Sequence, residues 1–149
     1  MSSTNKVIYL NLPIVSVSAS VAFYSAIGCT QNHTFSDATT ACMVISPNIN
    51  LMLLEHDRFR SFAPQSKTIS DAKSSVQMLI CISMDSREEV DAMVENAGKA
   101  GGKKDPSPSQ DHGMMYSRSF EDLDGHVWEV MWMDPSFAGA EAPDAKTED

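Results

Sequence analysis

The stretch FEDLDGHVWEV, residues 120–130, decides the fold of this chain. Its centre, Asp122-Leu123-Asp124-Gly125, has the composition of a tight hairpin turn, in which Gly125 supplies the positive φ that other residues adopt only at a cost. A β-prone run, His126–Met133, follows the turn, and another, Met114–Phe120, precedes it. The stretch therefore predicts an antiparallel β-hairpin near the end of the domain.

Outward from this hairpin, the same order of elements occurs twice along the chain. In the first half we expect a strand at 7–12 that ends at Pro13, and a helix at 18–27 that is capped near Ser16 and closed by Gly28. Three strands follow, at 30–35, 40–45 and 49–55. In the second half we expect a strand at 76–84, a helix from Ser86 to Gly101, a short strand at 103–105, and the two hairpin strands. Residues 106–111 read as a flexible loop.

The repeat predicts an α+β fold with two βαβββ modules that form a curved, half-open mixed sheet cup with the helices outside. We place one domain at about 1–135, with module one at about 6–56, an irregular linker at about 57–75 and module two at about 76–134. Residues 136–149 form an acidic tail that is disordered by composition.

Composition excludes several classes of partner. The chain has 149 residues and a net charge of −9, so it repels phosphate backbones and nucleic acid is not an expected partner. No apolar run reaches the roughly 20 residues that span a membrane, and the polar start of the chain is not that of a signal peptide. The three cysteines, Cys29, Cys42 and Cys81, read as reduced core thiols, which predicts a cytoplasmic protein.

The hairpin sequence resembles the F-x-D-P-D-G-x-x-x-E motif of the vicinal oxygen chelate superfamily, which includes glyoxalase I, bleomycin-resistance proteins, fosfomycin-resistance enzymes and extradiol dioxygenases. Residues 12–14 and 20–28, LPI and SVAFYSAIG, are similar to the opening motif of that superfamily. Ser16 stands where the family often has Asp, and Leu123 where it often has Pro. The resemblance implies the cup fold, a small-molecule ligand and a homodimer.

In glyoxalase I-like members, a divalent metal is held by one residue from the first strand and one from the last strand of each module. These positions are matched here by Tyr9, a residue at or near Leu53, Leu79 and Glu129. Only Glu129 is a good ligand, whereas a divalent cation needs three or more N or O donors. We therefore predict no metal site and no cofactor, and a member of the superfamily that binds a small molecule or acts without metal.

Strand alternation predicts which side chains face the cup. Glu129 is the candidate general base, and Tyr9 or Gln77 the candidate donor to a developing oxyanion. The candidate substrate-binding residues are Asn11, Leu53, Gln77, Leu79, His112, Tyr116, Arg118 and Met131. This lining is mostly apolar with a few polar groups, which suits a ligand with an apolar body and one or two polar handles.

Two alternatives remain open. One is a metal-dependent, lactoylglutathione lyase-like enzyme whose ligands are Glu129, His112 and Glu55. The other is a non-catalytic dimer that sequesters its ligand. Apart from Arg118, the predicted cup face carries no Arg or Lys, which argues against a strongly anionic ligand such as glutathione or fosfomycin.

Overall fold

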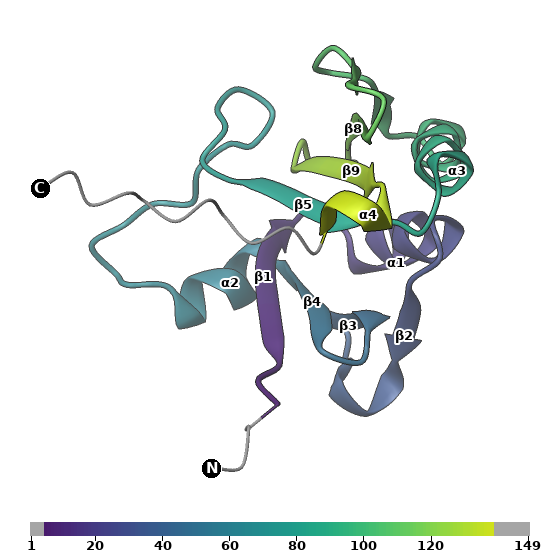
Figure 1. The fold of residues 1–149 in the computed structure, drawn as a ribbon. Coiled ribbons are helices and arrows are strands. Elements are labelled where there is room, and N and C mark those ends of the chain that lie inside the picture. Colours follow the sequence, from purple (N-terminus) through teal and green to yellow (C-terminus); the bar gives the residue numbers. More distant parts are fainter. Residues whose placement is uncertain (1–4, 139–149) are drawn as a thin grey trace, which may run out of the picture.

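The computed structural model describes residues 5–138, which form two sheets of four and five strands (Figure 1). The first sheet has the order β1 (Ile8–Ile14), β4 (Ile49–Glu55), β3 (Thr40–Ser46), β2 (Thr30–Asn32). The second has the order β5 (Leu79–Ser83), β9 (Val127–Met133), β8 (Met115–Glu121), β6 (Lys103–Lys104), and β7 (Gln110–Asp111) also pairs with β8. In each sheet the first strand of the module runs parallel to its last strand and the other pairs are antiparallel. The α+β fold with two equivalent modules in a curved, half-open mixed sheet is confirmed.

The two main helices begin at the serines that the sequence indicates. Ser16 Oγ accepts a hydrogen bond from Ala19 N at 3.2 Å at the start of α1 (Val17–Ala26), and Ser86 Oγ accepts one from Glu89 N at 3.1 Å at the start of α3 (Arg87–Lys99). Each bond satisfies a backbone donor that the first helical turn leaves without a partner. None of the helices among residues 5–138 is long and apolar enough to cross a membrane.

Several predicted boundaries are wrong. β1 continues through Pro13 to Ile14, because β1 is an edge strand, where a residue without an N–H is tolerated. The predicted strand at 30–35 stops at Asn32, whose side chain starts a 3-10 turn, His33–Phe35. The predicted loop at 106–111 contains β7.

A helix, α2 (His56–Phe62), occupies the start of the predicted linker. Its seven residues are mostly polar, and so short a segment does not show the apolar periodicity that predicts a helix. The predicted strand at 76–84 is confined to β5, so 76–78 belong to the connection. A short helix, α4 (Pro135–Ala138), follows the last strand, and the remainder of the predicted tail lies outside the described residues.

One hydrophobic core joins both modules. α1 and α3 contact each other and cover one face of the two sheets, and Figure 1 shows them together on one side of the molecule. Phe23 and Tyr24 of α1 pack against Phe120 and Trp128 of the second sheet, with ring centroids 6.0–6.1 Å apart. The helix of module one thus buries the hairpin of module two.

Hydrogen bonds also tie the hairpin turn of module two to module one. Tyr24 Oη donates to Asp122 Oδ2 at 2.6 Å and accepts from Trp128 Nε1 at 3.1 Å. Asp124 Oδ1 accepts from Val15 N at 2.9 Å. The FEDLDG turn therefore joins the two halves of the chain as well as two strands.

Candidate functional site

The face of each sheet that α1 and α3 do not cover is the inner face of the cup. In the second sheet it carries Leu79, Cys81, Glu129 and Met131, since strand neighbours in register share a face: Leu79 pairs with Val127, and Cys81 with Glu129. Of these, Leu79 is 53% exposed and Glu129 is half-buried. The prediction that these residues share one face is confirmed.

The inner face of the first sheet carries Tyr9 and Asn11 of β1 with Met52 and Leu54 of β4. Tyr9 is 53% exposed, and Asn11 Nδ2 donates to the carbonyl of Tyr9 at 3.2 Å. Tyr9 lies on a different sheet from Glu129, and no hydrogen bond joins them in the described chain.

Glu129 lies between Cys81 on β5 and Ser119 on β8. Its carboxylate has no hydrogen-bond or ion-pair partner among the side chains that the structure describes. Partial desolvation of its sulfur, and then the nearby Glu129 carboxylate, raise the pKa of the Cys81 thiol. Cys81 is exposed, so its assignment as a core thiol is wrong, whereas Cys42 is buried.

Leu53 does not line the cup. It is 0% exposed and pairs with Leu12 in the core that α1 covers. The inner face at this point is formed by its neighbours Met52 and Leu54. A shift of one residue exchanges the two faces of a strand, which is why the prediction failed.

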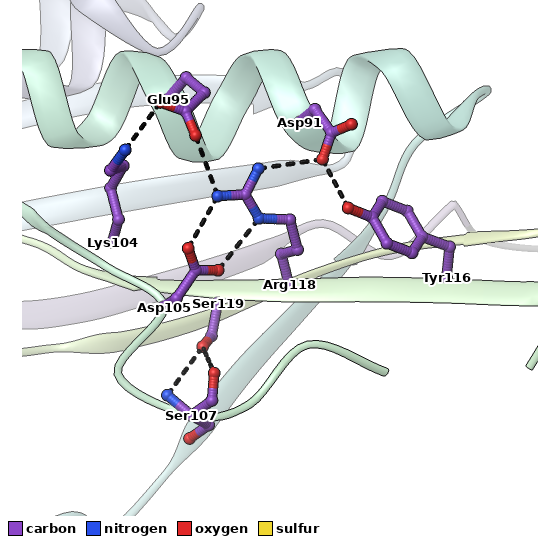
Figure 2. Close-up of polar contacts among 8 residues, drawn as sticks. All are labelled: Asp91, Glu95, Lys104, Asp105, Ser107, Tyr116, Arg118 and Ser119. Carbon is purple, nitrogen blue, oxygen red and sulfur yellow. Dashed lines mark hydrogen bonds and ion pairs between the residues drawn. The ribbon is translucent and has the colours of Figure 1, made fainter. Parts of the chain in front are cut away.

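Tyr116 and Arg118 also lie on the helix side, since the residue opposite Glu129 on β8 is Ser119. Figure 2 shows Arg118 pointing toward α3, with its guanidinium bonded to Asp105 at 2.8 and 3.0 Å, Asp91 at 2.9 Å and Glu95 at 3.0 Å. These carboxylates, Asp105 first, raise the pKa of Arg118. The predicted role of Arg118 and Tyr116 as ligand contacts is therefore replaced by a structural one, in which they hold α3 on the sheet.

His112 lies on the exposed turn between β7 and β8, with Nε2 at 3.5 Å from Gln110 Oε1. Glu55 Oε1 accepts from Val17 N at 3.2 Å, at the start of α1. Within residues 5–138, no three His, Cys, Asp or Glu side chains are grouped to hold a metal ion. The alternative ligand set of Glu129, His112 and Glu55 is not brought together.

The inner-face positions that match the metal-binding positions of the family are Tyr9, Met52, Leu79 and Glu129. One carboxylate, one phenol, one thioether and one aliphatic side chain do not provide the donors of a divalent-cation site. The residues present do not fit the metal that the fold family implies.

A cavity of about 570 Å³ lies where the two inner faces meet. It is bounded by α2, the ends of β1 and β9, and the connection at 63–78, which we call the strap. Its walls are mostly apolar, and Asn11 and Gln77 are among its polar groups. The full lining is Asn11, Leu12, Pro13, Leu54, Phe59, Phe62, Ala63, Pro64, Lys67, Thr68, Ile69, Ser70, Ala72, Ser75, Val76, Gln77, Met78, Ile80, Gly125, His126 and Val127.

The strap is held close to the hairpin turn. A Cβ on Gly125 would lie 2.8 Å from the backbone of Ala72 and Lys73, and Gly125 has φ +94°. Only glycine satisfies both the positive φ and this approach. On the other side of the turn, His126 Nε2 lies 2.8 Å from the carbonyl of Pro13.

Of the predicted site residues, the structure brings Asn11 and Gln77 into this cavity. Glu129 is not in its lining, but it follows Val127, which is, by two residues on the same face, about 7 Å along the strand. Sequence reasoning missed α2, Lys67 and His126. Phe59 and Phe62, the isolated aromatics of the linker, were the one signal in the sequence of an apolar wall there.

No protein-family model matches the chain, and no curated protein matches it in sequence. Solved structures do match. The hypothetical protein SA1046 from S. aureus has a TM-score of 0.69 at 24% identity, with 84% of this chain and 91% of that chain covered.

A glyoxalase/bleomycin resistance protein/dioxygenase family enzyme from Burkholderia phytofirmans PsJN has a TM-score of 0.68 at 19% identity, covering 84% and 96%. The fosfomycin resistance protein FosX from Listeria monocytogenes has a TM-score of 0.62 at 18% identity, covering 91% and 98%. At these identities the likeness is one of fold. The chain has the fold of the glyoxalase/bleomycin resistance/dioxygenase structures, the vicinal oxygen chelate fold that the FEDLDGHVWEV hairpin predicted.

Proposed function

We propose that this protein binds a small, mostly apolar molecule, without a metal ion, in the cavity beneath the strap. The observation that carries the proposal is the cavity itself: about 570 Å³ is within the range of small-molecule sites, which are typically about 300–1,000 Å³. Its aromatic and aliphatic walls favour an apolar body. Asn11 and Gln77 are available to hydrogen-bond with the polar groups of the ligand.

A thermal-shift screen of a small-molecule library tests this proposal. Val76 lines the cavity and is 63% exposed, so Val76→Trp adds an indole at the mouth without overpacking the core. Val7 is an exposed valine outside the lining, and Val7→Trp is its matched control. We expect hits on the wild type and on Val7→Trp that are lost on Val76→Trp. Hits that persist unchanged on Val76→Trp would place the binding elsewhere.

A second candidate function is metal-independent proton transfer by Glu129. Its support is the half-buried Glu129 carboxylate, which has no partner among the described side chains and lies on the same face as Val127 of the cavity. A carboxylate in this position can abstract a proton next to the carbonyl of a bound ligand. The test is deuterium exchange into a bound methyl ketone, followed by NMR. Exchange that Glu129→Gln does not slow would contradict this role.

We also propose that the protein is a cytoplasmic homodimer in which a second copy covers the inner faces. The support is the exposure of Tyr9 and Leu79, both 53% exposed, beside other exposed apolar side chains of the same face. Light scattering on wild type and Leu79→Glu tests this, and a wild-type monomer at micromolar concentration would contradict it.

A further inference from the structure

We propose that the ligand of the strap cavity is a monocarboxylic acid with an apolar body, held with its acid group at the mouth beside Lys67. This inference rests on the proposed function and names the chemical class of the ligand. The sequence argued against a strongly anionic ligand, because Arg118 was the one Arg or Lys on the predicted cup face. The strap adds Lys67 to the lining, which allows a ligand with a single negative charge.

The first observation is the charge of the lining. Among the residues that line the cavity, all of which are described, Lys67 carries the only formal charge, apart from the titratable His126. The chain as a whole has a net charge of −9, yet no Asp or Glu lines this cavity. A single cation at the edge of an otherwise uncharged apolar cavity matches one negative charge on a ligand.

The second observation is that Lys67 is available. No ion pair joins it to another side chain within residues 5–138. Its backbone N–H donates to the carbonyl of Pro64 at 3.0 Å, so a turn fixes its position on the strap. Lys67 is exposed and also lines the cavity, so we infer that its solvated ammonium group lies at the mouth.

The third observation concerns the adjacent surface. Lys67 also lines a second hollow, of about 560 Å³, together with Lys73, Arg60, Asp71 and Asp124. Both carboxylates there are engaged by the protein: Asp71 Oδ1 accepts from Lys73 N at 3.0 Å, and Asp124 Oδ1 from Val15 N at 2.9 Å. Arg60 is paired with Asp57 at 2.7 Å. Both aspartates keep their charge, so they balance the two lysines in this second hollow, and a preference for one anion belongs to the strap cavity, whose lining has Lys67 and no carboxylate.

The recognition that follows has two parts. The apolar body is buried among side chains such as Leu54, Phe62 and Val127, which supplies most of the affinity. The carboxylate stays near water beside Lys67, so no charge is buried without a partner. A dianion or a phosphate ester would need a second cation in the cavity, and the lining does not contain one.

The experiment is calorimetric titration of the full chain with octanoate, phenylacetate and naphthoate, each compared with its primary amide. We expect the acids to bind about three- to tenfold more tightly than the amides, the gain of one partly solvated ion pair. Lys67→Met should remove this preference, and raised salt should reduce it. Lys103→Met, an exposed lysine on β6 outside the lining, is the control and should keep it.

If acids and amides bind equally well to the wild type, or if Lys67→Met keeps the preference for acids, the assignment of a carboxylate is wrong while the binding cavity stands. If neither the acids, nor the amides, nor any compound of the screened library binds, the proposed function is wrong, and this inference with it.

Discussion

Replacing Tyr24 by Phe tests the junction on which the shape of the cavity depends. The hydroxyl of Tyr24 is buried, donates to Asp122 Oδ2 at 2.6 Å and accepts from Trp128 Nε1 at 3.1 Å. Tyr24→Phe keeps the ring and removes both bonds. Asp122 begins the turn whose residues Gly125, His126 and Val127 line the cavity. Loss of this anchor should therefore weaken the fold and loosen the site.

The expected cost follows from the two bonds. A hydrogen bond to a charged group contributes about 1.5–3 kcal/mol, and a buried donor left unpaired, here the indole N–H of Trp128, costs about 1–3 kcal/mol. Because the two effects overlap at one hydroxyl, we expect a loss of about 2–4 kcal/mol in the free energy of unfolding. For a chain of this size that corresponds to a fall in Tm of about 4–16 °C.

Urea denaturation followed by tryptophan fluorescence and circular dichroism gives the free energy of unfolding directly. Tyr9→Phe is the matched control, because Tyr9 is 53% exposed, and we expect it to change stability by less than about 0.5 kcal/mol. If Tyr24→Phe costs no more than Tyr9→Phe, the Tyr24 network does not hold the two modules together.

Three further changes have definite expected results. Gly125→Ala should lower the free energy of unfolding by about 1–3 kcal/mol and weaken ligand binding, since its Cβ would meet the Ala72 backbone at 2.8 Å. Gly28→Ala is its control, because Gly28 has a similar φ, +103°, with open space around it. Measured by differential scanning calorimetry, Gly28→Ala should lose less stability, and it should leave binding unchanged. Arg118→Met should cost about 1–3 kcal/mol in urea denaturation, because one guanidinium serves three carboxylates, and a change below about 0.5 kcal/mol would contradict its structural role. Hydrogen bonds from Tyr116, Lys104 and Arg87 are the main causes that lower the pKa values of Asp91, Glu95 and Asp111, respectively. A carboxyl group whose pKa is lower in the folded state stabilises the fold above its unfolded pKa, and this stabilisation is lost as the pH falls through the folded pKa. The free energy of unfolding should therefore decline below about pH 4, and an increase there would contradict these pairings.

Much of the fold could be predicted because local signals agreed with it. Ser16 and Ser86 cap the two long helices, and the Asp-Leu-Asp-Gly turn sets the final hairpin. That turn also places Glu121 opposite Val127 and hence Ser119 opposite Glu129, so the position of Arg118 on the other face was within reach of the sequence.

The sequence could not predict on which face of the sheet Leu53 lies. β4 reads INLMLLE, which is apolar on both faces, so only its register with β1, where Leu12 is opposite Leu53, decides which face is core. The cavity was equally hidden. It arises because the strap approaches Gly125 at Ala72 and Lys73, about fifty positions earlier in the chain. The strap itself has no hydrophobic periodicity that would predict this contact. Lys67 became a candidate only once that approach was known.

The most direct test of the account is a methyl-labelled NMR titration of the protein with octanoate. Ile69, Val76, Met78 and Val127 line the cavity, whereas Val90 and Val94 of α3 are buried in the core and are not part of the lining. We predict chemical-shift changes concentrated in the first group and absent from the second. Changes spread over both groups, or confined to methyl groups outside the lining, would contradict a binding site beneath the strap.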